Sequence, residues 1–131
     1  MVEIALRCKG LDGVVFVTDS NFGAGLPPGR YATPKWGEIL INGPNDGARL
    51  PDRNMELAGS ALSPIDNFRN AIRIFGKDIA TASHLCSRSP ARLMGLSKGD
   101  IAVGKDADLI VVGRNLEMRC TIAAGKVVYR A

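Results

Sequence analysis

The sequence predicts an α+β fold, in which the end of an α/β unit and a group of helices precede a small antiparallel sheet. Three observations support this class. A run of four apolar residues at 14–17 follows a helix-like segment, and such a run is typical of a strand buried on both faces. Two Ser-Pro pairs, at 63–64 and 89–90, indicate helix starts. From residue 107 the apolar residues adopt the spacing of strands.

The first element is predicted to be a helix that ends at Gly10, with Arg7 and Lys9 in its last turn. A short loop leads to Val14–Val17, which we expect to be a strand because its residues are β-branched or aromatic. Helix, loop and buried strand form the end of an α/β unit. We therefore expect the chain to begin within a larger arrangement.

Residues 20–56 are rich in glycine, proline, asparagine and aspartate, a composition that favours loops and turns. We expect a long loop over 21–29, a short strand over 38–41 and a turn over 42–47. Trp36 is expected to cover the edge of a core rather than to bind a ligand.

Three helices are predicted next. Ser63-Pro64 begins the first, which carries an apolar stripe at helical spacing and ends at Gly76. Asp78 can cap the second, and Ser89-Pro90 begins a short third helix that stops at Gly95. The stripe consists of Ile65, Phe68, Ile72 and Phe75.

The remainder is predicted to form strands over 107–112, 118–123 and 126–129, with Ala124-Gly125 as a two-residue hairpin turn. The predicted organisation has four parts: a helix, a strand and a loop come first, then short strands and loops, then a loop with helices, and finally a group of strands. These four parts cover residues 1–30, 31–56, 57–98 and 99–131.

Composition excludes several classes of protein. The 131 residues are 46% apolar and 23% charged, as in ordinary globular domains and unlike disordered or collagen-like chains. No run of 18 apolar residues exists, so no membrane partner is expected. The net charge of +4 comes from singly spaced basic residues with little aromatic interleaving, which does not favour nucleic-acid binding. Three widely separated cysteines predict no disulfide framework and a reducing, cytoplasmic location.

Asp19 is the sharpest candidate for chemistry. It follows the predicted strand Val14–Val17 at the entry to a glycine-rich loop, and α/β enzymes place catalytic groups at the carboxyl ends of strands. There a carboxylate could accept a proton from a metal-bound water and return it to a leaving group. Position alone leaves a second interpretation open, in which Asp19 caps a helix or orders its own loop.

A second candidate is the segment containing Ala58, Gly59 and Ser60, whose small residues leave backbone N–H groups open to an oxygen-rich ligand. A tight packing corner would have the same composition. The single histidine, His84, cannot form a histidine-rich zinc site, and we expect it to be hydrogen-bonded at a helix surface. Asp106 and Asp108 are expected to be turn or capping residues rather than metal ligands.

Taken together, these segments resemble the C-terminal part of N-acetylglucosamine-6-phosphate deacetylases. The Thr-Asp segment followed by Leu-Ala-Gly-Ser is specific to that branch, whereas the closing segment is similar to that of the wider amidohydrolase superfamily. The resemblance covers nearly the whole chain and rests on Val14–Ser20, Gly23–Tyr31, Leu57–Leu62, Ser89–Leu96 and Gly99–Val112.

The resemblance implies part of a (β/α)₈ metal-dependent hydrolase barrel and of its small β-sandwich, with Val14–Val17 as the eighth barrel strand. It implies that residues 1–30 hold the last barrel helix and strand with the catalytic loop, that 57–98 hold the substrate loop with outer helices, and that 99–131 hold sandwich strands. Asp19 matches the catalytic aspartate that activates the metal-bound water and then protonates the departing amine. Ala58, Gly59 and Ser60 match the loop that contacts the sugar. The implied substrate of the complete enzyme is an amino-sugar phosphate whose N-acetyl amide is hydrolysed, and the implied cofactor is a zinc-like divalent metal.

The family's metal ligands, a glutamate and two histidines on earlier strands, have no counterpart in this sequence. We therefore expect no metal bound to this chain, an inactive isolated chain, and a truncated or expressed fragment of a longer enzyme. Self-association into a homo-oligomer is expected to cover the lone barrel strand. The alternatives are a fragment of another, dihydroorotase-like amidohydrolase and a non-catalytic, self-associating domain of amidohydrolase ancestry.

Overall fold

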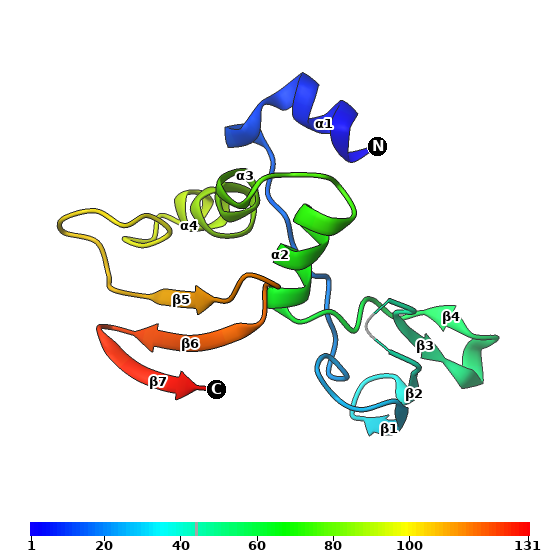
Figure 1. Ribbon diagram of the computed structural model, residues 1–131. Helices are drawn as coiled ribbons and strands as arrows, with labels where there is room; N and C mark the ends of the chain where they lie inside the picture. The colour runs from blue at the N-terminus through cyan, green and yellow to red at the C-terminus, as the bar shows by residue number, and fades with distance from the viewer. Residues whose placement is uncertain (44) are drawn as a thin grey trace. The chain divides into compact units, whose positions relative to one another are not determined.

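The computed structural model describes residues 1–43 and 45–131, and the chain divides into two compact units (Figure 1). The central unit contains residues 17–67, and the discontinuous unit contains residues 1–16 and 68–131. The described residues form both helices and strands, as the predicted mixed class requires. None of the helices in the described part of the chain is long and apolar enough to cross a membrane.

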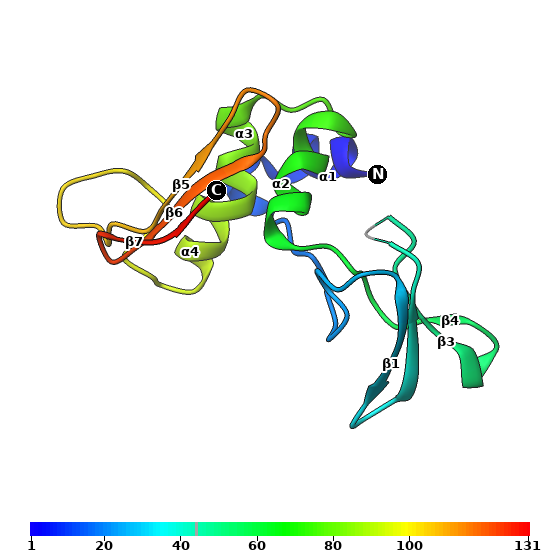
Figure 2. The same cartoon turned by 60° about the horizontal axis from the view of Figure 1, so that its bottom comes forward.

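The central unit is built on a four-stranded antiparallel sheet with its strands in sequence order (Figures 1 and 2). The predicted strand 38–41 is confirmed as β2, in which Ile39 and Ile41 are buried while the residues between them are less so. The other three strands were not predicted, because their sequences lack a clear apolar alternation. The strands are β1 (Gly29–Thr33), β2 (Gly37–Ile41), β3 (Ala48–Leu50) and β4 (Glu56–Leu57).

The core of the central unit lies against β2 and β3 and consists of Ile39, Ile41, Ala48, Leu50 and Ala61. Trp36 is half-buried against this core, as predicted. The ring of Phe22 meets it edge-on with centroids 6.4 Å apart, and the Lys35 ammonium lies 5.5 Å from its centroid. A short 3₁₀ turn, η2 (Pro51–Arg53), connects β3 to β4. The predicted turn at 42–47 is present where it is described, and Pro44 lies outside the described residues.

The predicted strand Val14–Val17 is wrong for this chain. Residues 14–19 are not paired with any strand in the described parts, and the Val17 side chain is 72% exposed. The neighbour of Phe16 is a helical segment, whose Leu85 carbonyl accepts the Phe16 N–H at 3.0 Å. An apolar, β-branched run becomes a strand only when another backbone lies alongside to complete its hydrogen bonds.

The discontinuous unit begins with α1 (Val2–Lys9), which ends as predicted at Gly10, where φ is 68°. The 3₁₀ turn η1 (Leu11–Gly13) follows. The predicted helix after Ser63-Pro64 is confirmed as α2 (Pro64–Arg73), which begins in the central unit and ends three residues before the predicted end at Gly76. Its residues Phe68 and Ala71 are buried. The Ser63 backbone N–H and hydroxyl both donate to the Asp66 carboxylate, at 3.1 and 2.5 Å. The helix start is therefore closed by Asp66 reaching back to Ser63.

The second and third predicted helices form one helical run. Asp78 caps α3 (Ile79–Ser83) as predicted, accepting the Thr81 N–H at 2.6 Å. The predicted short third helix is present as α4 (Ser89–Leu93), but the π-helical segment η3 (His84–Arg88) continues directly into it, so no break separates it from the helix before. Because Pro90 has no N–H to donate to the preceding turn, a wider turn before it keeps the chain helical. Instead of capping, the Ser89 hydroxyl donates to the Leu11 carbonyl.

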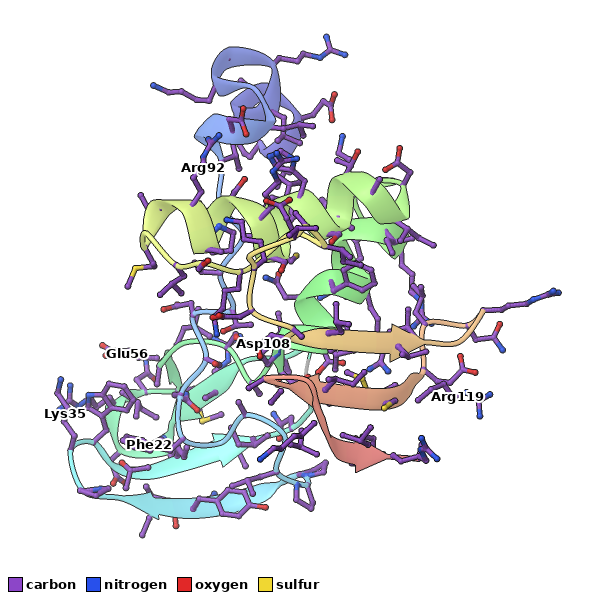
Figure 3. The ribbon with its side chains drawn as sticks, turned by 90° about the vertical axis from the view of Figure 1, so that its left-hand side faces the viewer. Phe22, Lys35, Glu56, Arg92, Asp108 and Arg119 are labelled. Atoms are coloured by element: carbon purple, nitrogen blue, oxygen red, sulfur yellow. The ribbon has the colours of Figure 1, made fainter. Side chains whose placement is uncertain are left out.

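The three predicted C-terminal strands are confirmed as an antiparallel sheet of β5 (Leu109–Val112), β6 (Met118–Ala123) and β7 (Lys126–Arg130). The two-residue turn between β6 and β7 is also confirmed, with φ of 47° at Ala124 and 77° at Gly125. Asp108, at the start of β5 (Figure 3), accepts the Ala124 N–H at 2.8 Å. Its other carboxylate oxygen lies 2.5 Å from the Lys98 ammonium.

Candidate functional site

The two segments singled out in the sequence lie side by side in the central unit. Ser20 and Ser60 form an isolated parallel bridge. The Ser60 N–H donates to the Asp19 carbonyl at 2.7 Å, and the Asn21 N–H donates to the Ser60 carbonyl at 3.2 Å. The fold therefore brings Asp19 together with Ala58–Ser60 by backbone pairing.

Side chains reinforce this pairing. The Ser60 hydroxyl donates to the Thr18 carbonyl and accepts the Leu62 N–H at 3.2 Å. The Thr18 and Ser20 hydroxyls lie 2.9 Å apart. The Asn21 side-chain amide donates to the Ala58 carbonyl at 2.9 Å. Polar side chains on both segments thus hold the backbone on either side of Asp19 in place.

Asp19 and Gly59 meet in unusual backbone conformations. Asp19 has a φ of 50°, a left-handed value that aspartate tolerates better than most residues. Gly59 has a φ of 100°, and a Cβ atom there would lie only 2.7 Å from the Asp19 carbonyl oxygen and 3.8 Å from its Oδ2. The Gly59 main chain therefore packs directly against that of Asp19, whose exposed carboxylate can accept and return a proton. The prediction of open N–H groups in this segment is wrong at two positions, because the Ala58 N–H donates to the Ala48 carbonyl at 2.7 Å and the Ser60 N–H donates to Asp19.

The interpretation of Asp19 as a helix cap does not hold, because the residues that follow it form a turn and then β1. Sequence reasoning missed the part played by Asn21 and Thr18. The spacing of Asn21 and Gly23 is the pattern of a turn in which an asparagine side chain accepts a backbone N–H two residues later, and the structure has that bond at 2.9 Å. The turn could thus have been recognised in the sequence, whereas the bond from Asn21 to Ala58 could not.

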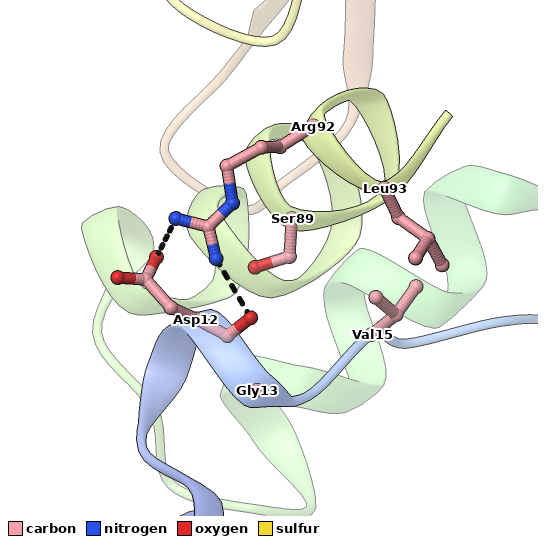
Figure 4. A pocket seen from close by; sticks show the side chains of 6 residues that line it. All are labelled: Asp12, Gly13, Val15, Ser89, Arg92 and Leu93. Atoms are coloured by element: carbon pink, nitrogen blue, oxygen red, sulfur yellow. Dashed lines mark hydrogen bonds and ion pairs between the residues drawn. The ribbon is translucent and has the colours of Figure 1, made fainter. Parts of the chain in front are cut away.

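A pocket of about 400 Å³ lies in the discontinuous unit, between η1 and α4 (Figure 4). The Arg92 guanidinium contacts the Asp12 carboxylate at 2.9 Å and donates to the Asp12 carbonyl at 2.8 Å. His84 Nε2 lies 3.0 Å from the same carboxylate, which confirms it as a hydrogen-bonded histidine of the helix surface. These contacts, with that of His84 foremost, hold the pKa of Asp12 below its usual value. The pocket lining is Asp12, Gly13, Val15, Ser89, Arg92 and Leu93, none of which belongs to the two candidate segments.

The described residues do not make up a metal-binding shell by themselves. Across residues 1–43 and 45–131, no three His, Cys, Asp or Glu side chains are grouped so that they could hold a metal ion. Asp106 and Asp108 instead share the Lys98 ammonium, at 3.5 and 2.5 Å. This pairing is consistent with their predicted structural role.

Comparison with known proteins places this geometry in context. Residues 2–128 match the model of the amidohydrolase family. The chain is 34% identical over 127 residues to an N-acetylglucosamine-6-phosphate deacetylase of Lysinibacillus sphaericus, covering 96% of this chain and 32% of the relative. It is 31% identical over 114 residues to a putative N-acetylgalactosamine-6-phosphate deacetylase of Escherichia coli K12, covering 86% and 65%.

The chain also resembles the crystal structure of an N-acetylglucosamine-6-phosphate deacetylase from Thermotoga maritima, with a TM-score of 0.82 and 32% identity. The match covers all of this chain and 35% of that one. The chain therefore spans about a third of the length of the Lysinibacillus sphaericus relative and of this solved structure.

Proposed function

Because the chain belongs to the amidohydrolase family, we propose that it is the part of an N-acetylglucosamine-6-phosphate deacetylase that carries the proton-transfer residue, Asp19. One observation supports this above all. The Asp19 segment and the Ala58–Ser60 segment, far apart in sequence, are joined by the Ser60 N–H to Asp19 carbonyl bond at 2.7 Å. The Asp19 carboxylate and the Ala58–Ser60 segment are thereby held next to each other.

The proposed reaction hydrolyses the N-acetyl amide of the amino sugar. Water attacks the amide carbonyl carbon, and the Asp19 carboxylate takes up the proton that the water loses. The same carboxyl group then gives that proton to the nitrogen as the C–N bond breaks. Acetic acid, which then ionises to acetate, and the free amino sugar are released, and Asp19 returns to its ionised form. An exposed carboxylate suits this role because it must meet both the water and the leaving nitrogen.

In this proposal Ala58, Gly59 and Ser60 contact the sugar. Gly59 supports the assignment, since a Cβ atom there would lie 3.8 Å from Asp19 Oδ2. The absence of a side chain lets the Asp19 main chain pack directly against Gly59, which keeps this segment close to the carboxylate. The substrate is N-acetylglucosamine-6-phosphate, and the similarity to the Escherichia coli protein makes the galactosamine epimer the second candidate.

We further propose that the remaining part of the enzyme supplies what this chain lacks. The divalent metal that the family implies would be held there, since the described residues do not make up a metal shell. The exposed Val17 and the unpaired segment before it would lie against barrel strands of that part. The sheet β5–β6–β7 would belong to the small β-sandwich, and the homo-oligomer is a proposal of the same kind.

A hybrid enzyme tests the function. In it, this chain replaces the matching 32% of the Lysinibacillus sphaericus relative, and release of acetate from each of the two sugar phosphates is measured. We expect activity that falls about 10²–10⁴-fold in Asp19→Asn. Asp52→Asn, at an exposed position on η2, is the matched control and is expected to leave the rate unchanged. An Asp19→Asn hybrid as active as the unmodified hybrid contradicts the proposal.

A further inference from the structure

We infer that Asn21 is a positioning residue that holds Asp19 against the substrate-contacting segment Ala58–Ser60, an inference that rests on the proposed function. Asn21 follows Asp19 by two residues and is half-buried. Its backbone N–H donates to the Ser60 carbonyl at 3.2 Å, and its side-chain amide donates to the Ala58 carbonyl at 2.9 Å. One residue thus bonds to both ends of the opposite segment.

The conformation of Asp19 gives this tether a physical reason. A non-glycine residue at a φ of 50° is held there by its surroundings, because the left-handed region is less favourable for residues that carry a Cβ. The first connection between the two segments is the hydrogen bond that the Asp19 carbonyl accepts from the Ser60 N–H. The side-chain bond of Asn21 to Ala58 adds a second connection on the far side of Gly59 and opposes rotation about the first.

Asn21 also connects the site to the core of the central unit. Its Oδ1 accepts the Gly23 N–H at 2.9 Å, which closes a tight turn. Gly23 is buried so closely against Ile41 of β2 that a side chain there would collide with it. Since Ile41 is only 1% exposed, the turn is fixed to a rigid sheet. Such support keeps a reactive group in its productive geometry.

Two substitutions separate the two bonds made by the Asn21 side chain. Asn21→Ala removes both. Asn21→Ser keeps a hydroxyl that can accept the Gly23 N–H but is too short to reach the Ala58 carbonyl. The matched control is Asn42→Ala, which removes an exposed amide-to-carboxylate bond to Asp46 at 2.6 Å in the same unit.

Hydrogen exchange of the 131-residue chain tests the tether directly. The probe is the Ser60 N–H, which donates to the Asp19 carbonyl, and the reference is the Met55 N–H, which donates to the Leu50 carbonyl at 3.0 Å outside both segments. Both Asn21 variants are expected to speed exchange at Ser60 about tenfold while Met55 changes little. Unchanged protection at Ser60 in both variants overturns the inference, whatever the activity.

Kinetics of the hybrid enzyme test the consequence. We expect both Asn21 variants to lower kcat about 10–100-fold with KM within about threefold, because misplacement of a reacting group affects the chemical step. Asn42→Ala should match the unmodified hybrid. Full kcat in Asn21→Ser, or a change in KM alone, overturns the inference. An unmodified hybrid without deacetylase activity counts against the proposed function instead, and the exchange experiment still decides the tether.

Discussion

Replacing Gly59 by alanine is expected to weaken the contact between the two segments of the candidate site. The new Cβ would lie 2.7 Å from the Asp19 carbonyl oxygen, on a backbone with a φ of 100°. The unfavourable backbone conformation costs about 1–2 kcal/mol. Loss of the hydrogen bond from Ser60 to Asp19 adds about 1 kcal/mol. We therefore expect the free energy of unfolding of the central unit to fall by about 2–3 kcal/mol.

Gly25→Ala is the matched control, because Gly25 has a φ of 79° and no atom within 4 Å of the position its Cβ would take. It carries a backbone cost of the same kind without the collision. Urea unfolding followed by the fluorescence of Trp36, the one tryptophan of the sequence, reports on the central unit, to whose core it is packed. Equal losses of stability in the two variants would refute the argument, since the collision with Asp19 would then contribute nothing.

Two further predictions concern the discontinuous unit. The hydrogen bond from Lys98, and after it that from the Ala124 N–H, holds the pKa of Asp108 below its ordinary value of 3.8. The stability that the ionised carboxylate contributes is therefore complete above pH 3.8 and is lost as the pH falls through the lowered pKa. An NMR titration should show the Ala124 amide shifting below pH 3.8 in the native chain and not in Asp108→Asn, and a shift in both would contradict the assignment. Burial raises the pKa of the Cys86 thiol to about 11, so at pH 8 iodoacetamide should modify the exposed Cys8 well before Cys86, because the thiolate is the reacting form. Mass spectrometry gives the order, and faster modification of Cys86 would contradict it.

Several elements could be predicted because their causes are local. The cap at Asp78 needs only a carboxylate three residues before the Thr81 N–H that it accepts. The turn at Ala124-Gly125 needs two residues that tolerate a positive φ between alternating strands. The strand over 38–41 could be predicted from its own apolar residues, of which Ile39 and Ile41 form the buried face. In each case the stabilising contact lies within a few residues, where a pattern in the sequence can show it.

The candidate residues Asp19 and Ala58–Ser60 were also found from the sequence, but as two separate segments. Their resemblance to a known family suggested a shared role, and the residue types were compatible with it. Neither the backbone bond between Asp19 and Ser60 nor the tether made by Asn21 follows from local pattern, because each joins positions about 40 residues apart, as Thr18 and Ser60 are by 42. Such pairings depend on the register of the intervening strands.

Tertiary structure alone decided the state of Val14–Val17 and of the helical run through Ser89. The first has the composition of a strand but lies beside a helical carbonyl, that of Leu85, instead of another strand. The second has a helix-start pair, yet the preceding π-helical segment carries the helix through it. An apolar run or a Ser-Pro pair limits the secondary structures that a segment can form. Which of these it adopts depends on the neighbouring backbone that satisfies its hydrogen bonds.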